Sequence, residues 1–156
     1  MINVTFVCMG NICRSPMAEA IFTNMVEKAG LSKQFHIDSV GTIQHHSGEP
    51  AHPGTRRILT QNNISYQGQS RKITQADFRQ ADYLVAMDDD NVQALKRLDV
   101  ERLHTDRILK LLDFAVNTTI RNVPDPYYHD NFDQVYALVN DGCSGLLSHL
   151  KSLHNI

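Results

Sequence analysis

The chain has 156 residues, 42% of them hydrophobic, a size and composition that fit one globular domain over residues 1–156. Its 15 basic and 17 acidic residues give a formal net charge of −2, which favours neither nucleic acid nor a membrane surface as a partner. No apolar run approaches the roughly 20 residues needed to span a bilayer, and no signal-peptide pattern opens the chain. We therefore expect a cytoplasmic protein, and secretion without a signal peptide stays open.

The cysteines and histidines predict neither a disulfide framework nor a metal site. Cys8, Cys13 and Cys143 are an odd number, and a reducing cytoplasm keeps thiols free. The spacing of Cys8 and Cys13 does not match a zinc knuckle, and the eight histidines are scattered along the chain. We expect no metal and no other cofactor.

The first predicted element is a buried strand over residues 2–8, which are mostly β-branched or aromatic and include no Pro or Gly. The short loop that follows, residues 9–14, contains Gly10 and Asn11, the residue types that best tolerate a positive φ.

A helix is predicted to begin directly after this loop. Ser15 is suited to the N-cap and Pro16 to the first helical position. The apolar residues that follow have helical spacing, and Gly30 ends the run.

The rest of the chain alternates between strands and helices. In chain order we expect a strand over 35–40, a polar loop over 41–52, a helix over 53–61, a short helix over 73–78, a strand over 83–87, a helix after the three aspartates at 88–90, a strand or a turn over 108–112, a loop over 117–131 and a long helix from 132 that buries Cys143. This alternation predicts a single parallel α/β sheet, whose ligands bind at the carboxyl ends of the strands.

The loop after the first strand carries Cys8 and, six residues later, Arg14. Its backbone N–H groups can surround an anion, and the following helix N-terminus adds partial positive charge. This environment favours a thiolate, the form of cysteine that attacks phosphorus. The planar guanidinium of Arg14 can hold two phosphate oxygens at once. The sequence therefore predicts a phosphate-binding loop, to which we also assign Met9, Gly10, Asn11, Ile12, Cys13 and Ser15.

Three loop residues have more specific expected roles. Ser15 could donate its hydroxyl to the Cys8 sulfur, and Asn11 could brace the loop through its side-chain amide. Cys13 could form a reversible disulfide with Cys8 under oxidative stress, or it could be a small packed residue.

Asp125 is the best candidate for a proton donor. It lies between Pro124 and Pro126, which stiffen the backbone around it. As an acid it would protonate a leaving oxygen, and as a base it would then activate water. The neighbouring Tyr127 and Tyr128 could wall the cleft and stack on a substrate ring.

These motifs resemble those of the low-molecular-weight protein tyrosine phosphatases, and the resemblance covers the whole chain. The family pattern C-x-G-N-x-C-R-S-P matches Cys8 through Pro16, and its acid loop D-P-Y-Y matches Asp125 through Tyr128. The segment from Met87 to Asn91 is similar to the family's M-D-x-x-N.

The resemblance implies a four-stranded parallel sheet flanked by helices, a phosphocysteine intermediate and no metal cofactor. It assigns Cys8 as the nucleophile, Arg14 as the phosphate binder and Asp125 as the acid and base. It makes Asn11 and Ser15 supports of the loop.

Two positions depart from the family pattern. Many relatives carry a tryptophan where this chain has His45, a predicted substrate contact. Some carry a histidine where this chain has Gly68, just before Ser70-Arg71.

Three other functions share this scaffold. Arginine phosphatases tend to carry threonine at the position of Ile12, whose bulk here favours a flat aromatic substrate. Arsenate reductases need further cysteines, and none lies between Cys13 and Cys143. A phosphocarrier would only store phosphate, whereas Arg14 with Asp125 favours turnover. We expect a phosphotyrosine-containing protein as substrate, no nucleic-acid or membrane partner, and a monomer, with weak self-association left open.

Overall fold

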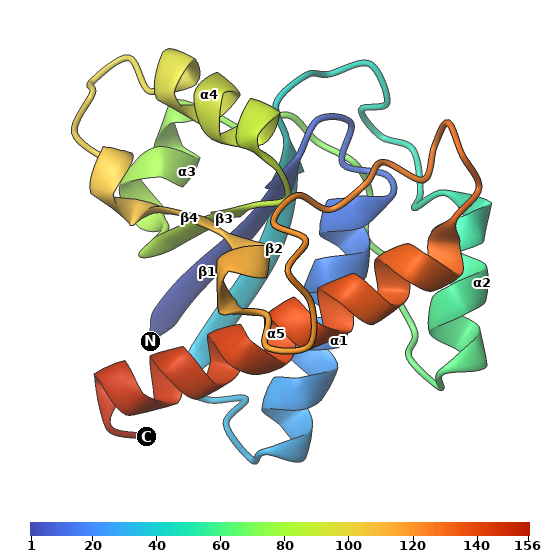
Figure 1. Ribbon diagram of the computed structural model, residues 1–156. Coiled ribbons are helices and arrows are strands. Elements are labelled where there is room, and N and C mark those ends of the chain that lie inside the picture. The colour runs from blue at the N-terminus through green and yellow to red at the C-terminus, as the bar shows by residue number, and fades with distance from the viewer.

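The computed structural model describes residues 1–156 and places four parallel strands in one sheet (Figure 1). The order in the sheet is β2-β1-β3-β4, with β1 at Ile2–Cys8, β2 at Phe35–Gly41, β3 at Tyr83–Ala86 and β4 at Ile108–Lys110. Strand β1 pairs with β2 along its whole length, so that Cys8, its last residue, lies opposite Gly41. The predicted α/β fold with a four-stranded parallel sheet is confirmed.

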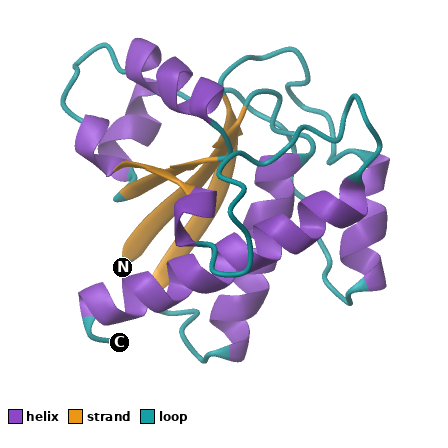
Figure 2. Cartoon of the chain, viewed as in Figure 1, coloured by secondary structure: helices purple, strands orange, loops and turns teal.

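Helices cover both faces of this sheet (Figure 2). On one face lie α1 (Arg14–Lys28), α2 (Pro53–Gln61) and α5 (Phe132–His154); on the other lie α3 (Gln75–Gln80) and α4 (Asp89–Leu98). Strand β1 serves both layers, because Val4 and Phe6 pack with α1 and α5 whereas Val7 packs with α3 and α4. None of the helices combines the length and apolarity needed to cross a bilayer.

The strand order places the end of β1 at a switch in topology. The chain leaves β1 through α1 on one face, and after β2 it reaches β3 through α3 on the other face. In open parallel sheets such a point leaves a crevice at the carboxyl ends of the strands, where ligands bind. The loop after Cys8 lies in this crevice.

The start of α1 differs from the prediction. Helix α1 begins at Arg14 with Cys13 as its N-cap, so the expected N-cap role of Ser15 is wrong. Ser15 and Pro16 lie inside the first turn. Proline is tolerated there because the first backbone N–H groups of a helix have no partner within the helix. The Ser15 hydroxyl is thereby free for other contacts.

Other elements differ in smaller ways. The short helix α3 begins at Gln75, because Thr74 and Asp77 form a reciprocal capping box at its start. The segment predicted as a strand or a turn is both, since β4 passes directly into a 3-10 helix at Leu111–Phe114, and a second 3-10 helix at Thr105–Arg107 precedes β4.

Helix α5 packs very closely against the 3-10 helix at Leu111–Phe114. A Cβ at Gly145 would collide with the Phe114 carbonyl oxygen, and one at Gly142 would lie 2.7 Å from the Leu111 side chain. Two glycines on one face of α5 therefore allow this approach, and the Phe114 contact is the stricter of the two because backbone cannot rotate away.

We predict that Gly145→Ala lowers the free energy of unfolding by about 1–3 kcal/mol, the usual cost of overpacking, despite the better helix propensity of alanine. Urea unfolding followed by circular dichroism measures the change. Ser144→Ala, at an exposed neighbour on α5, is the matched control and should leave stability nearly unchanged. Equal stability of both variants would contradict the close-packing argument.

Candidate active site

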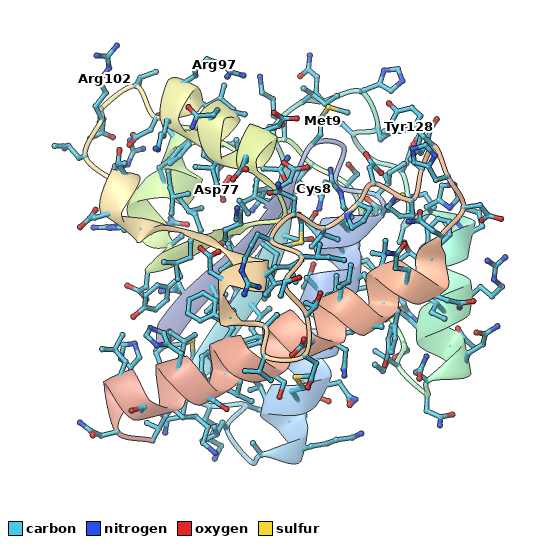
Figure 3. The ribbon with its side chains drawn as sticks, viewed as in Figure 1. Cys8, Met9, Asp77, Arg97, Arg102 and Tyr128 are labelled. Carbon is cyan, nitrogen blue, oxygen red and sulfur yellow. The ribbon has the colours of Figure 1, made fainter.

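A cavity of about 240 Å³ opens at the carboxyl end of β1. It brings together the three residues predicted to be catalytic, Cys8, Arg14 and Asp125, from β1, α1 and the loop before α5. Figure 3 shows Cys8 with its sulfur at this edge of the sheet and Tyr128 on the loop that leads to α5. The remaining lining residues are Met9, Gly10, Ile12, Cys13, Ile43, His45, His46, Tyr127 and Tyr128.

The Cys8 sulfur lies at the base of the cavity and is only slightly exposed. The backbone N–H of Asn11 points at it, with 3.3 Å between N and Sγ, and the Ser15 hydroxyl oxygen lies 3.1 Å from Sγ. The Asn11 backbone N–H and the Ser15 hydroxyl thus both contact one sulfur at the N-terminal end of α1.

Asn11 shapes the loop around this sulfur. Its φ is 56°, in the left-handed region, whereas Gly10, the other residue expected to tolerate a positive φ, does not use one. The Asn11 side-chain oxygen accepts the Arg71 backbone N–H at 3.0 Å, and its amide nitrogen donates to the hydroxyls of Ser15 and Ser39 at 2.8 and 3.0 Å. Asn11 and Ser15, both assigned to the phosphate-binding loop, do not line the cavity, and their side chains bond to each other instead.

Arg14 is buried, and three acceptors hold its guanidinium. Nη1 donates to the Asp88 carboxylate at 2.5 Å and to the Val123 carbonyl at 3.0 Å, and Nη2 lies 3.6 Å from the Asp125 carboxylate. Burial alone would lower the pKa of Arg14, but the negative charge at Cys8 and the bond to Asp88 outweigh it and raise that pKa. The guanidinium of Arg14 therefore stays positively charged at physiological pH.

Asp88 is a site residue whose contact with Arg14 sequence analysis missed. The three aspartates at 88–90 predict no more than the helix that follows them, and Asp88 does cap α4 by accepting the Asn91 backbone N–H at 2.8 Å. Its second carboxylate oxygen binds Arg14. No local pattern could have revealed that contact, because the two residues lie 74 positions apart.

Asp125 reaches the cavity from the Pro-flanked loop before α5. One carboxylate oxygen accepts the Tyr127 backbone N–H at 3.1 Å, and the other faces Arg14. This turn limits where the side chain can go. The carboxyl group is about one quarter exposed, so it can meet both a bound ligand and water.

Aromatic and imidazole rings form the walls of the cavity. The His46 ring centroid lies 4.6 Å from that of His45 and 5.7 Å from that of Tyr127, and Tyr127 packs edge-on against Tyr128. His46 also pairs with Glu49 at 2.7 Å. Sequence analysis missed His46. Both histidines lie in a turn, and both line the cavity.

Cys13 is buried beside Cys8, and both are free thiols. Burial raises the pKa of Cys13 to about 12, and the charges of Cys8 and Asp125 add to this rise. Cys13 therefore stays protonated at neutral pH. The third, Cys143, is fully buried in α5 and confirms the expectation of a core residue.

The geometry suits nucleophilic substitution on an anion. A sulfur nucleophile, a fixed guanidinium and a carboxyl group converge on one space, which the loop after β1 and the start of α1 line. No group of three or more His, Cys, Asp or Glu side chains is arranged to hold a metal ion.

Comparisons with known proteins agree with this site. A sequence model described as "Low molecular weight phosphotyrosine protein phosphatase" matches residues 3–155. The chain is 42% identical over 152 residues to the low molecular weight protein-tyrosine-phosphatase YfkJ of Bacillus subtilis, with 97% of each protein covered. It is 40% identical over 156 residues to the low molecular weight protein-tyrosine-phosphatase PtpA of Staphylococcus epidermidis, covering 100% of this chain and 98% of that protein.

Solved structures extend the likeness to the fold. The crystal structure of YfkJ superposes with a TM-score of 0.93 and covers 97% of this chain and 96% of that one. That of an arginine phosphatase of Drosophila has a TM-score of 0.88 at 30% identity and covers 95% of this chain and 97% of that one. On sequence and fold together, this chain belongs to the low molecular weight phosphotyrosine protein phosphatase family.

Proposed function

We propose that the protein is a protein-tyrosine-phosphatase that hydrolyses phosphotyrosine through a phosphocysteine intermediate. The observation that carries this proposal is the convergence of Cys8, Arg14 and Asp125 on one cavity in a member of this family. The family description and the names of the relatives supply the substrate class, and the geometry supports the mechanism.

Phosphate binds in the cradle formed by the loop after β1. The backbone N–H groups of the loop and of the first turn of α1 meet its oxygens, and Arg14 adds a charged donor. Because Asp88 and Val123 occupy Nη1 of Arg14, Nη2 is the nitrogen turned toward the ligand, beside Asp125. Arg14 stabilises the charge that spreads over the equatorial oxygens in the transition state.

In the first step the Cys8 sulfur attacks phosphorus. The S–P bond forms, the bond between phosphorus and the tyrosine oxygen breaks, and Asp125 gives its proton to that oxygen. In the second step Asp125 takes a proton from water, whose oxygen attacks phosphorus and breaks the S–P bond. The Ser15 hydroxyl and the Asn11 backbone N–H stabilise the departing thiolate.

The walls favour an aromatic leaving group. Tyr127, Tyr128 and His45 offer ring faces and edges to a bound phenyl ring, and Ile12 adds an apolar surface at the loop. We further infer that the protein acts as a cytoplasmic monomer on tyrosine-phosphorylated proteins, with at most weak self-association. Its net charge of −2 offers no attraction to nucleic acid or anionic membranes.

The proposal is tested by assaying matched peptides that carry phosphotyrosine, phosphoarginine or phosphoserine. We expect phosphotyrosine to be hydrolysed with the highest kcat/KM, because its long flat side chain reaches the loop and fills the aromatic cavity. Cys8→Ser is the control and should abolish hydrolysis of all three. A preference for phosphoarginine would assign the chain to the arginine phosphatases, and activity of Cys8→Ser would contradict the mechanism.

The acid role of Asp125 predicts dependence on the leaving group. Asp125→Ala should slow hydrolysis of phosphotyrosine by roughly 10²–10⁴-fold, the usual contribution of a general acid. An aryl phosphate with a much more acidic phenol should lose far less in phosphocysteine formation, measured as the burst of phenol. Asp133→Ala, at an exposed aspartate in the first turn of α5, is the control. Equal losses on both substrates would argue against proton donation.

We propose in addition that Cys13 protects Cys8 from irreversible oxidation. Peroxide converts the Cys8 thiolate to a sulfenic acid, and the Cys13 sulfur then displaces hydroxide to form a disulfide. The high pKa of Cys13, about 12 through its burial, makes this second step slow at neutral pH and faster at alkaline pH.

Peroxide treatment should therefore yield a Cys8–Cys13 disulfide that dithiothreitol reverses with recovery of activity. Peptide mass spectrometry identifies the pair. Cys143→Ser should behave as wild type, whereas Cys13→Ser should end in irreversible loss of activity. Sulfonic acid at Cys8 as the sole product in the wild-type protein would contradict this role.

A further inference from the structure

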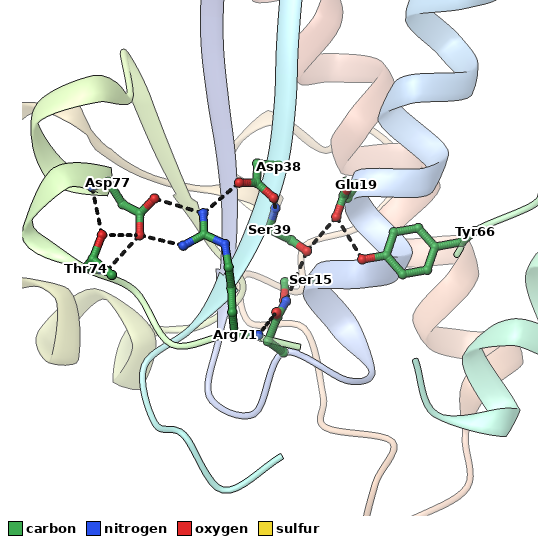
Figure 4. A network of polar contacts seen from close by, with 9 residues as sticks. Ser15, Glu19, Asp38, Ser39, Tyr66, Arg71, Thr74 and Asp77 are labelled. Atoms are coloured by element: carbon green, nitrogen blue, oxygen red, sulfur yellow. Dashed lines mark hydrogen bonds and ion pairs between the residues drawn. The ribbon is translucent and has the colours of Figure 1, made fainter. Parts of the chain in front are cut away.

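A chain of hydrogen bonds runs from the Cys8 sulfur through Ser15 and Asn11 to a group of residues that do not line the cavity. Figure 4 shows the part of this chain from Ser15 to Tyr66. Its members beyond Asn11 are Ser39, Glu19 and Tyr66. The Ser39 hydroxyl donates to the Glu19 carboxylate at 2.6 Å, and the Tyr66 hydroxyl donates to the same carboxylate oxygen at 3.0 Å. Neither Glu19 nor Tyr66 lines the cavity, and the mechanism above uses neither.

The direction of proton donation along this chain is determined. The Arg71 backbone N–H can only donate, so the Asn11 side-chain oxygen faces it and the amide NH2 faces both serines. Each serine oxygen therefore accepts from Asn11. Each serine also has one proton to give, and these protons go to opposite ends of the chain: that of Ser39 to Glu19, and that of Ser15 to the Cys8 sulfur.

This order requires Glu19 to be an acceptor. Burial raises the pKa of Glu19, and the hydroxyl groups of Ser39 and Tyr66 act against that rise. Asp38 adds to the rise and Arg71 opposes it. If Glu19 were protonated, it could donate to the Ser39 oxygen and compete there with Asn11. The Tyr66 hydroxyl thus helps to keep Glu19 ionised and the Ser39 oxygen available to Asn11.

Gly68 is what allows Tyr66 to reach Glu19. A Cβ at position 68 would collide with the Tyr66 hydroxyl and would lie 2.5 Å from the ring carbon that bears it. The φ of Gly68 is not in the left-handed region, so its backbone alone does not require glycine. Because glycine has no side chain, position 68 leaves room for the Tyr66 phenol. The contact between Tyr66 and Glu19 therefore depends on Gly68.

We propose that Tyr66 is a positioning residue for the Cys8 nucleophile: acting through Glu19, Ser39 and Asn11, it directs the Ser15 hydroxyl at the sulfur. This inference rests on the proposed function, since it assigns Tyr66 to the same reaction. Tyr66 does not touch the substrate. Its contribution lies in the ionisation of the Cys8 thiol and in the stability of the departing thiolate.

Tyr66→Phe tests the proposal, because it removes the hydroxyl and keeps the ring. We expect the pH midpoint of Cys8 alkylation by iodoacetamide to rise by roughly half a unit. We expect kcat for an aryl phosphate to fall roughly threefold to tenfold, which corresponds to the free-energy contribution of one hydrogen bond. KM should change little, since the phosphate cradle is intact. Gly68→Ala, which displaces the phenol, should change both quantities in the same direction.

Alkylation is read at Cys8 itself by fragmenting, in the mass spectrometer, the peptide that carries both Cys8 and Cys13. Cys13, whose pKa burial raises to about 12, and the fully buried Cys143 serve as internal references. Tyr83→Phe is the matched control, because the Tyr83 hydroxyl also makes one hydrogen bond, to His154 at 2.8 Å, far from the site. It should leave midpoint and kcat unchanged.

The proposal is overturned if Tyr66→Phe lowers thermal stability while the alkylation midpoint and kcat stay as in wild type, since Tyr66 would then be merely structural. It is equally overturned if Tyr83→Phe shifts the midpoint as much as Tyr66→Phe. Failure of the proposed function is distinguishable, because the wild-type protein would then not hydrolyse phosphotyrosine although the alkylation midpoint could still be compared among variants.

Discussion

The left-handed backbone at Asn11 is the constraint on which the rest of the site depends. It turns the chain back after Cys8, so that the Asn11 backbone N–H meets the sulfur and the following residues enter α1. That conformation costs a non-glycine residue about 1–2 kcal/mol. Asparagine bears this cost because its side chain makes three hydrogen bonds, to Arg71, Ser15 and Ser39, which anchor the loop to β2 and its neighbours.

Arg14 and Asp88 join the two layers of helices across the end of the sheet. Arg14 belongs to α1 on one face, and Asp88 caps α4 on the other. Because Arg14 is almost fully buried, its charge needs a partner, and loss of Asp88 would leave a buried cation poorly compensated. The same contact that satisfies this charge also orients the guanidinium, so the stability of the fold and the geometry of the anion site depend on one ion pair.

The sequence was sufficient for the parts of the structure that rest on local chemistry. Residues 2–8 predict their strand through composition, and the Cys8-to-Arg14 spacing predicts the anion loop. The failures have physical reasons. Ser15 suits an N-cap by its residue type, but its hydroxyl instead accepts from Asn11 and donates to the Cys8 sulfur. The roles of Asp88 and Tyr66 depend on contacts 74 and 47 residues distant, which no local pattern encodes.

Burial divides the site into two parts that can change independently. The base is almost closed to solvent, with Asn11, Arg14 and Ser15 exposed by 3% or less. The polar groups of these side chains are hydrogen-bonded to neighbouring residues. A substitution in the base therefore leaves a buried polar group unpaired, which costs the chemistry and the fold together. The rim is different, since Tyr127 and Tyr128 are 47% and 67% exposed. Rim side chains can be exchanged without disturbing the base, so the shape of the ligand that the cavity accepts can vary on this scaffold while the buried arrangement around Cys8 stays the same.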